Sequence, residues 1–311
     1  GTDSKLMQAL IRAAQSGKEV TVVVELLARF DEDTNINWAQ RLEEVGAHVI
    51  YGVVGHKTHA KLALVIRRED GALKRYAHLG TGNYHARTAR LYTDFGLLTC
   101  NEELTQDVNQ LFTQITGLGK AGKMKRLWQS PFTLHGEIVA AIEREADNAR
   151  AGKPAAIIAK MNALLEPHVI AALYAASQAG VKIDLIVRGV CALRPGIAGL
   201  SDNIRVRSVV GRFLEHSRIF YFKNVDGEEM VYLSSADWMD RNFFRRIETC
   251  FPILNPKLKK RVIAEGLKPY LRDNVQAWEM LSDGSFRRKA SRGAKPYCAQ
   301  GALLGLYARQ K

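Results

Sequence analysis

A short motif that the chain carries twice constrains its fold more than any other feature. His59 and Lys61 open one apolar segment, and His216 and Arg218 open a second one. Side chains two apart on a β-strand point to the same face, so each histidine is predicted to lie beside its cation. The expected strands cover residues 60–66 and 217–222.

The repeat continues beyond these motifs in a constant register. Asn83 corresponds to Asp237 and Asp94 to Glu248, and the step from the first position to the second is 11 residues in both halves. Three further pairs keep the register: Leu79 with Leu233, Tyr84 with Trp238, and Arg87 with Arg241. Two halves with one chemical plan suggest a single site built between them.

The duplicated histidine motif resembles the phospholipase D-like superfamily, in which one histidine from each half meets at a pseudo-two-fold axis. Longer segments are similar to the two C-terminal domains of the type 1 bacterial polyphosphate kinases, and they are residues 22–31, 78–84, 88–94 and 232–239. The resemblance spans nearly the whole chain. It implies an α/β fold of two phospholipase D-like domains related by an internal repeat, with the active site between them.

Hydrophobic content, apolar run lengths and cysteine spacing together predict a cytoplasmic protein with a large core. The 311 residues are 47% hydrophobic, and their number suggests two domains. No apolar run reaches the roughly 20 residues that span a bilayer, and the start of the sequence does not resemble a signal peptide. The cysteines lack metal-ligand spacing and are interpreted as reduced thiols: Cys100, Cys191, Cys250 and Cys298.

The formal net charge of +13 predicts a polyanionic partner. Nucleic acid, an acidic membrane surface and polyphosphate all carry the required charge. The sequence has no helix-turn-helix, zinc-finger or aromatic RNA-binding signature, so no nucleic-acid partner is expected, whereas peripheral attachment to a membrane is compatible with the charge. Part of the excess lies in residues 287–295, which are interpreted as a solvated basic tail.

Helices and strands are predicted to alternate in both halves, as in a layered α/β domain. The strand at residues 20–25 is rich in β-branched side chains and is expected to be covered on both faces. Further strands are expected at residues 48–53, 156–160, 182–188, 230–234 and 248–254. Helices are expected at residues 4–16, 36–45, 102–115, 134–149, 167–178 and 256–271, and residues 283–295 are expected to be loose.

Residues 117–123 are the best candidate for a linker, because three glycines fall within six residues there. This divides the chain into residues 1–122, a first phospholipase D-like domain with His59, and residues 123–311, a second one with His216 and the basic tail. The resemblance also implies that the chain is the C-terminal part of a longer protein whose N-terminal domains help to bind the nucleotide base. Homo-oligomers formed through that longer chain are compatible with this interpretation.

The chemistry of the motif follows from the reaction of imidazole with phosphorus. Neutral imidazole is a good nucleophile near neutral pH, since its ordinary pKa is about 6.5. The resemblance implies that His59 becomes phosphorylated and that His216 is its acid–base partner. Lys61 and Arg218 would grip phosphate oxygens, because phosphoryl transfer depends mainly on positioning and electrostatics.

The resemblance further implies nucleotide or phosphate contacts at Arg29, Tyr92 and Arg188. Arg29 would line the region where Mg²⁺ and phosphate meet. An arginine cannot itself ligate the ion because it has no acceptor atom. The expected Mg²⁺ would be held by the phosphates of ATP and by water.

Four positions follow from the repeat itself. Asp94 and Glu248 are predicted to accept the far ring N–H of the histidines, which fixes the tautomer and raises the basicity of the ring; the alternative is a pair of surface carboxylates. Asn83 and Asp237 either bind phosphate or shape the loop, and binding is favoured because both halves keep a polar group there. His78 and His85 are interpreted as structural, and no role is assigned to His48, His56, His135 or His168.

Three functions fit these features. The leading one is a polyphosphate kinase core that transfers the terminal phosphate of ATP reversibly to polyphosphate through phosphohistidine, with ATP, ADP and polyphosphate as substrates. The others are a phospholipase D-like phosphodiesterase acting on lipid or nucleic acid and a non-catalytic polyanion-binding fragment. Arg218 and Asp237 replace the lysine and asparagine usual in the superfamily, which favours the kinase.

Overall fold

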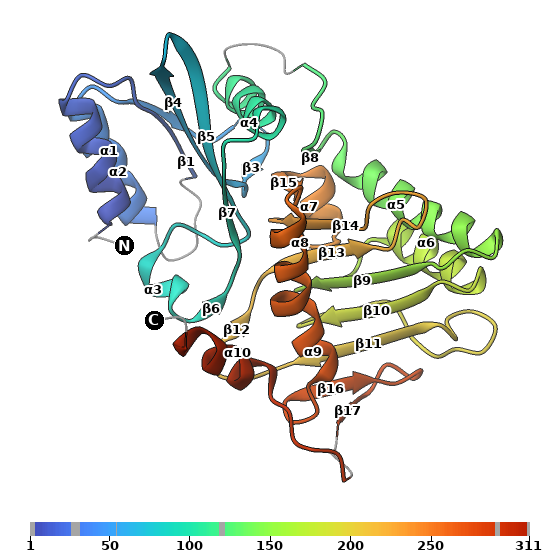
Figure 1. The fold of residues 1–311 in the computed structure, drawn as a ribbon. Helices are drawn as coiled ribbons and strands as arrows, with labels where there is room; N and C mark the ends of the chain where they lie inside the picture. Colours follow the sequence, from blue (N-terminus) through green and yellow to red (C-terminus); the bar gives the residue numbers. More distant parts are fainter. Residues whose placement is uncertain (1–3, 26–31, 54, 118–121, 290–292, 310–311) are drawn as a thin grey trace.

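The computed structural model describes residues 4–25, 32–53, 55–117, 122–289 and 293–309. Helices pack on β-sheets in both halves of the chain, so the predicted α/β class is confirmed (Figure 1). Within the described residues, none of the helices has the length and apolar character needed to cross a bilayer.

A mixed sheet of ten strands organises the second half. Helices α5 (Leu134–Arg150) and α6 (Pro167–Gln178) lie on one face, and α8 (Pro256–Val262) and α9 (Lys268–Arg272) lie on the other (Figure 1). The strand order is β17 (Phe286–Arg288), β16 (Ala277–Met280), β11 (Ile204–Val209), β10 (Lys182–Val187), β9 (Ala156–Met161), β13 (Arg218–Phe222), β14 (Met230–Ser234), β15 (Arg246–Pro252) and β3 (Lys57–Thr58), with β8 (Trp128–Ser130) also paired to β15.

The first half has two small sheets instead of one large one. Strands β1 (Thr21–Val24) and β2 (His48–Tyr51) pair in parallel, and three antiparallel strands form the other sheet. Those three are β4 (Lys61–Glu69), β5 (Ala72–Gly80) and β7 (Gly96–Thr99). The helices are α1 (Lys5–Gln15), α2 (Glu32–Glu44), α3 (Ala86–Ala89) and α4 (Glu102–Ile115).

Two strand predictions in this half are corrected. Strand β1 is not covered on both faces, because Thr21 is exposed and only Val24 is buried; with β2 as its one partner in the described chain, the sheet is too narrow to be enclosed. Strand β4 runs past residue 66 because it forms a hairpin with β5. Asp70 and Gly71 make the turn with φ of 50° and 80°, the left-handed values that two-residue hairpin loops require.

The single helix predicted at residues 256–271 is wrong. The structure has α8, a π-helical turn at Ile263–Leu267 and then α9. Pro269 explains the interruption, because a proline inside a helix donates no backbone N–H and its ring collides with the carbonyl four residues earlier. A π-helical turn accommodates the missing hydrogen bond and the proline ring, so α9 can follow α8 directly.

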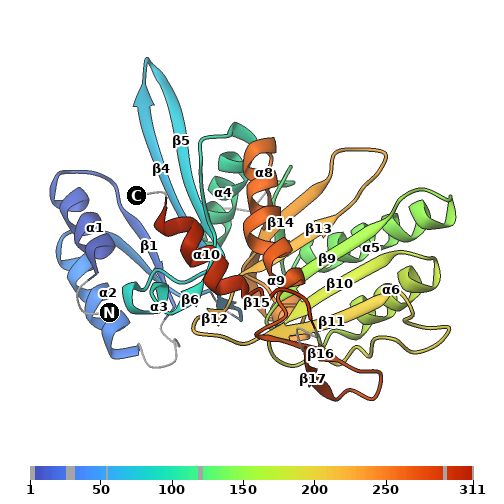
Figure 2. The same ribbon diagram turned by 60° about the horizontal axis from the view of Figure 1, so that its bottom comes forward.

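Several elements were absent from the prediction. Part of the supposedly loose segment is β17, which pairs with β16, although residues 290–292 lie outside the described chain. Residues 118–121, which form most of the predicted glycine linker, also lie outside the described chain. Strands β8 and β11 were missed, as was helix α10 (Ala299–Ala308), which lies beside β6 (Tyr92–Thr93) and β12 (Leu214–Glu215) in both views (Figures 1 and 2).

Two short strand pairs join the halves. Strand β3 of the first half pairs in parallel with β15 of the second, placing Lys57 opposite Arg246. Strand β12 of the second half pairs in parallel with β6 of the first, placing Leu214 opposite Tyr92. The repeat relates these positions to each other. Each half therefore pairs one short strand with a strand of the other half, and the two pairings are equivalent.

The halves also share one hydrophobic core. Ala77 and Leu79 of β5 and Leu104 of α4 are buried in the same cluster as Ile219 and Phe251 of the large sheet. A separate core lies on the opposite face of the sheet, beneath α5 and α6. Burial of apolar side chains from both halves in one cluster fixes their relative position.

Candidate active site

Each histidine of the repeat lies where the chain passes between an exchanged strand and a strand of its own half. His59 follows β3, and its backbone N–H and that of Ala60 both donate to the carbonyl oxygen of Ile247, at 2.9 Å each. His216 follows β12, and its backbone N–H donates to the hydroxyl of Thr93 at 3.3 Å. Each histidine is therefore anchored by the opposite half.

Two carboxylates complete these positions in a crossed arrangement. His59 Nδ1 lies 2.8 Å from Glu248 Oε2, and His216 Nδ1 lies 2.8 Å from Asp94 Oδ1. The structure brings each histidine of the motif together with one of the two carboxylates predicted to orient the rings, and each acid contacts the histidine of the other half. In both rings it is Nδ1 that faces the carboxylate, so the far nitrogen, Nε2, is turned away from it.

The tautomer of His216 follows from its two neighbours. A guanidinium can only donate hydrogen bonds, and Arg218 Nη1 lies 3.2 Å from His216 Nε2. That nitrogen therefore carries a lone pair, and Nδ1 carries the proton that points to Asp94. The partners assign a neutral ring with its basic nitrogen facing the site.

A second layer of hydrogen bonds holds each carboxylate. The hydroxyl of Thr81 donates to Asp94 at 2.6 Å, and the hydroxyl of Ser235 donates to Glu248 at 2.5 Å. Asn242 adds a further donor to Glu248 at 2.6 Å. The sequence analysis did not single out these residues, although Thr81 and Ser235 stand in the same register as the pairs that it used.

The two cations of the motif are buried and turned toward the histidines. Lys61 is 5% exposed and its ammonium donates to the carbonyl oxygen of His59. Arg218 is 4% exposed and donates to the corresponding carbonyl of His216 at 2.7 Å. Arg218 is also held by Asp237, through two contacts of 3.0 and 3.2 Å.

Burial controls the charge of these groups. It lowers the pKa of His59 and of His216 below the ordinary histidine value, despite the carboxylate beside each ring. It also lowers the pKa of Lys61 to about 7. Burial acts to raise the pKa of Glu248, but its contacts with His59 and Lys61 leave that pKa below its usual range.

The other predicted site residues lie around this centre. The ring centroids of Tyr92 and His216 are 5.1 Å apart. Arg188 donates to the side chain of Asn162 at 3.0 Å, and Asn162 donates in turn to the carbonyl of His216 at 3.3 Å. Asn83 is exposed on its loop, whereas Asp237 is buried against Arg218. Arg29 lies outside the described residues.

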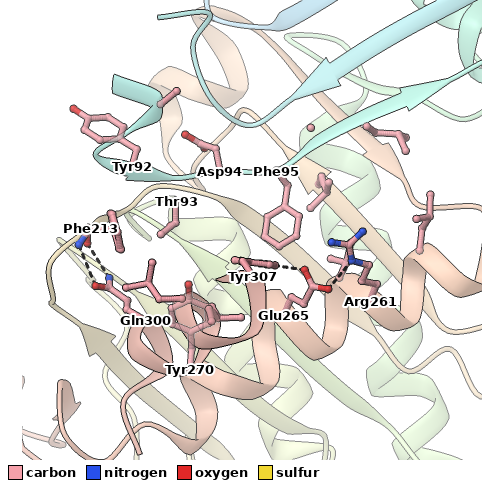
Figure 3. Close-up of a pocket in the computed structure, with 18 of the residues that line it drawn as sticks. Tyr92, Thr93, Asp94, Phe95, Phe213, Arg261, Glu265, Tyr270, Gln300 and Tyr307 are labelled. Carbon is pink, nitrogen blue, oxygen red and sulfur yellow. Dashed lines mark hydrogen bonds and ion pairs between the residues drawn. The ribbon is translucent and has the colours of Figure 1, made fainter. Parts of the chain in front are cut away.

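An apolar cavity of about 460 Å³ lies between the halves, next to this centre (Figure 3). Tyr92, Thr93 and Asp94 form part of its wall, and α10 contributes Gln300 and Tyr307. Neither histidine of the repeat is among the described residues that line the cavity. Because its wall is mainly hydrophobic, it does not suit a polyanion.

Comparisons with known proteins cover both halves. The family description "Polyphosphate kinase C-terminal domain 1" matches residues 1–121, and "Polyphosphate kinase C-terminal domain 2" matches residues 127–300. The chain is 67% identical over 311 residues to a polyphosphate kinase of Paraburkholderia phytofirmans and 66% identical over 313 residues to one of Burkholderia multivorans. These matches cover 99% of this chain and 45% of each relative, so the chain spans about half their length.

A solved structure agrees with these matches. The crystal structure of polyphosphate kinase from Porphyromonas gingivalis is similar to this chain with a TM-score of 0.91 and 41% sequence identity. The similarity covers 100% of this chain and 47% of that one.

Proposed function

The chain belongs to the polyphosphate kinase family, and from that premise we propose that it carries the phosphoryl-transfer centre of an enzyme that passes the terminal phosphate of ATP reversibly to polyphosphate. The observation that carries the proposal is the pair of crossed histidine–carboxylate contacts, which aim two basic nitrogens into one site between the halves. The charge of +13 supports an anionic polymer as substrate.

His59 is proposed as the nucleophile. Its neutral Nε2 attacks the terminal phosphorus of ATP, a P–N bond forms, and the P–O bond to ADP breaks with its electron pair leaving on the ADP oxygen. The product ring carries a positive charge, because Nδ1 keeps its proton. Glu248 accepts that N–H and offsets the charge, as the orienting acid does in other histidine-based sites.

His216 is proposed as the acid–base partner. A terminal phosphate oxygen of polyphosphate attacks the phosphorus on His59, the P–N bond breaks, and the chain grows by one unit. Nε2 of His216 takes up or returns a proton at the attacking or leaving oxygen. Asp94 holds Nδ1–H and supports the charged form of the ring.

The surrounding polar residues are proposed to position phosphate. Lys61, Arg188 and Arg218 supply positive charge for the non-bridging oxygens. Asp237 acts through Arg218 by holding its guanidinium and is a positioning residue. Asn83 and Tyr92 contact substrate from the exposed side of the site.

Mg²⁺ is proposed to accompany the nucleotide. The ion prefers oxygen ligands, and among the described residues the carboxylates nearest the histidines already accept hydrogen bonds from His59, His216 and Arg218. ATP phosphates and water would therefore hold the ion, which would neutralise part of the phosphate charge. Arg29 is proposed to line that region without ligating the ion.

The predicted division of the chain is also kept as a proposal. Residues 1–122 and 123–311 would each contribute one histidine and one carboxylate to the shared site. In this arrangement neither part holds a complete histidine–carboxylate pair of its own.

The deciding experiment is transfer of labelled phosphate. After incubation with γ-labelled ATP and Mg²⁺, we expect acid-labile, alkali-stable phosphate on His59, which ADP removes. His59→Ala should carry no label. The rate of labelling of His216→Ala should be lower than that of the parent chain by roughly 10²–10⁴-fold. Phosphate mapped to His216 would reverse the assignment, and cleavage of a phosphodiester without any label from ATP would indicate the phospholipase D-like alternative.

A further inference from the structure

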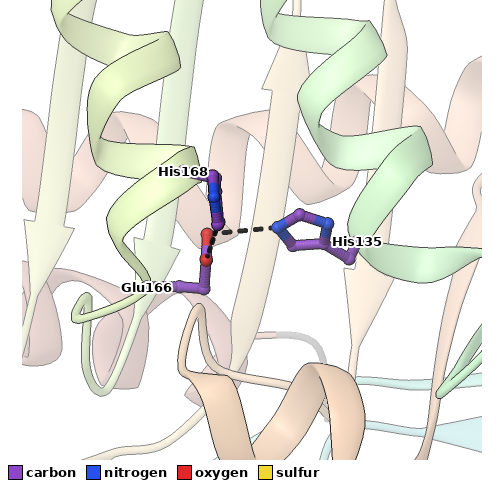
Figure 4. Close-up of side chains that lie close together, drawn as sticks. All are labelled: His135, Glu166 and His168. Carbon is purple, nitrogen blue, oxygen red and sulfur yellow. Dashed lines mark hydrogen bonds and ion pairs between the residues drawn. The ribbon is translucent and has the colours of Figure 1, made fainter.

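A group of metal-ligating side chains lies outside the phosphoryl-transfer centre. His135 stands in the first turn of α5, while Glu166 and His168 flank the start of α6 (Figure 4). His135 Nε2 is 3.2 Å from Glu166 Oε2, and His168 Nδ1 is 2.9 Å from Glu166 Oε1. One ligand atom from each of the three lies within 4.8 Å of the others, and in the described part of the chain no other group of three His, Cys, Asp or Glu side chains meets this condition.

The surroundings hold two of the three ligands in place. The Glu166 side chain is 3% exposed, and its Oε2 also accepts the backbone N–H of Val169 at 2.7 Å, as the cap of α6. The ring of His135 packs 5.1 Å from Phe243 and 5.0 Å from Phe244 of α7 (Asp240–Phe244). The side chain of His168 is 80% exposed, so the third ligand borders solvent.

We propose that His135, Glu166 and His168 form a binding site for a divalent transition metal of the Zn²⁺ class. Two imidazoles and a carboxylate are the donor set that Zn²⁺ accepts in open sites, with water in the fourth position. Mg²⁺ and Ca²⁺ prefer all-oxygen ligands, so they fit this group poorly. The nitrogen–oxygen distances of 2.9 and 3.2 Å are close to those between ligands around one small ion.

Binding needs only a small change at the three side chains. Each neutral ring releases to water the proton that points to Glu166 and takes one from water on its other nitrogen, so the freed nitrogen can bind the metal with no net change in protons. The positive end of the α6 dipole opposes a cation there. The buried carboxylate offsets this, and its four lone-pair positions suffice for both the helix cap and a metal.

The site would brace the wall of the phosphoryl-transfer centre. The backbone N–H groups of Leu165 and Glu166 both donate to the carbonyl of Trp238, at 2.8 and 3.1 Å. Phe243, which packs on His135, neighbours Asn242, the donor to Glu248. A metal at this position links α5 to the start of α6, so it should raise the thermal unfolding midpoint of the chain.

Titration of the 311-residue chain with Zn²⁺, and with Co²⁺ for its visible ligand-field absorption, tests the proposal. We expect one equivalent to bind and the unfolding midpoint to rise. His168→Ala removes an exposed ligand without disturbing the core, and it should weaken Zn²⁺ binding at least about tenfold, since even residues that only orient a ligand change affinity by 10–100-fold. Glu166→Gln should weaken binding as well.

Two matched controls separate this site from adventitious surface binding. His48→Ala removes another exposed histidine, and Cys100→Ser removes an exposed thiol. Both variants should bind Zn²⁺ like the parent chain. The proposal is overturned if no stoichiometric binding occurs, or if His168→Ala binds as tightly as the parent while circular dichroism shows both to be folded.

Discussion

The two histidines differ from ordinary surface histidines because their environment sets both charge and tautomer. Burial keeps the rings neutral to lower pH than usual, while Asp94 and Glu248 pull the opposite way and hold each Nδ1–H. A lowered pKa means that the neutral form persists below pH 6.5. The proposed nucleophile, His59, therefore keeps a neutral ring across the neutral range.

Removing one orienting charge should slow transfer without weakening substrate binding. Asp94→Asn deprives His216 of a carboxylate that raises its pKa, so the pKa falls further and the charged ring loses support. We expect kcat to fall at least about tenfold and up to 10²–10⁴-fold, with the acid limb of the pH profile moved to lower pH.

Steady-state kinetics with polyphosphate as the varied substrate measures this effect. The same substitution at an exposed position, Asp147→Asn, is the control and should change nothing. A rise in KM at unchanged kcat would show that Asp94 acts on binding instead.

Lys61 should make polyphosphate affinity depend on pH. With a pKa of about 7, its ammonium is charged below that pH and neutral above it, so its attraction for phosphate fades as the pH rises through 7. Bound polyphosphate favours the charged ammonium of Lys61, so it raises the pH at which that group loses its proton. Lys61→Met should bind more weakly at about pH 6 and show less pH dependence up to about pH 9.

Equilibrium binding at a series of pH values checks this expectation. Lys74→Met makes the same change at an exposed lysine of the β4–β5 hairpin and should leave the profile intact. An unchanged profile in Lys61→Met would assign the pH dependence to another group.

At the scale of secondary-structure elements, the repeat predicts which residues matter but not which half they serve. The register pairs Asp94 with Glu248 because side-chain type and spacing are visible in a sequence. The exchange of β3 and β12 is not visible there, since each strand has two residues and no periodicity can be read from two positions. The crossed arrangement therefore had to come from the structure.

The π-helical turn between α8 and α9 gives a prediction about packing. A Cβ at Gly266 would collide with the end of Ile219 and lie 3.1 Å from the ring of Phe95. Gly266→Ala should lower the free energy of unfolding by about 1–3 kcal/mol, the usual cost of overpacking a core.

Urea denaturation measures this loss. Gly305→Ala, in α10, is the matched control because a Cβ there meets nothing within 4 Å, so its stability should equal or exceed that of the parent. Equal stability of Gly266→Ala would mean that the end of Ile219 and the ring of Phe95 can move aside at this contact.

Across the whole molecule, the sequence predicted the α/β class and, in the second half, helices α5 and α6. It missed α10, whose residues are mostly small or apolar and include two glycines, so no amphipathic pattern marks it. It also missed β11, where Arg205 and Arg207 interrupt the apolar residues although Arg207 is buried. Arg207 is buried because backbone carbonyls of α9 accept its guanidinium, a tertiary contact that the sequence does not reveal.

Cations around the proposed site should contribute more to polyphosphate binding than the cations of the basic tail, residues 287–295. Arg188 is linked through Asn162 to the carbonyl of His216, whereas Arg287 is exposed on β17. Neutralising one charge at each place, Arg188→Gln and Arg287→Gln, gives a matched pair. We expect the first to weaken polyphosphate binding more at every salt concentration, because partly buried charges are screened less.

Titration with polyphosphate at several ionic strengths compares the two variants. Circular dichroism first establishes that both are folded. A larger loss in Arg287→Gln would place the main polyanion contacts on β17 and the residues after it.

The crossed contacts also decide when the proposed site is completed during synthesis of the chain. Glu248 follows His59 by 189 residues, so the ribosome adds it roughly 10–40 s later at ordinary elongation rates. Until then the first histidine has no acid to hold its ring and no β15 beside its strand. In the proposed mechanism, a chain that lacks the second half holds no complete nucleophile, because His59 meets Glu248 only when the second half folds onto the first.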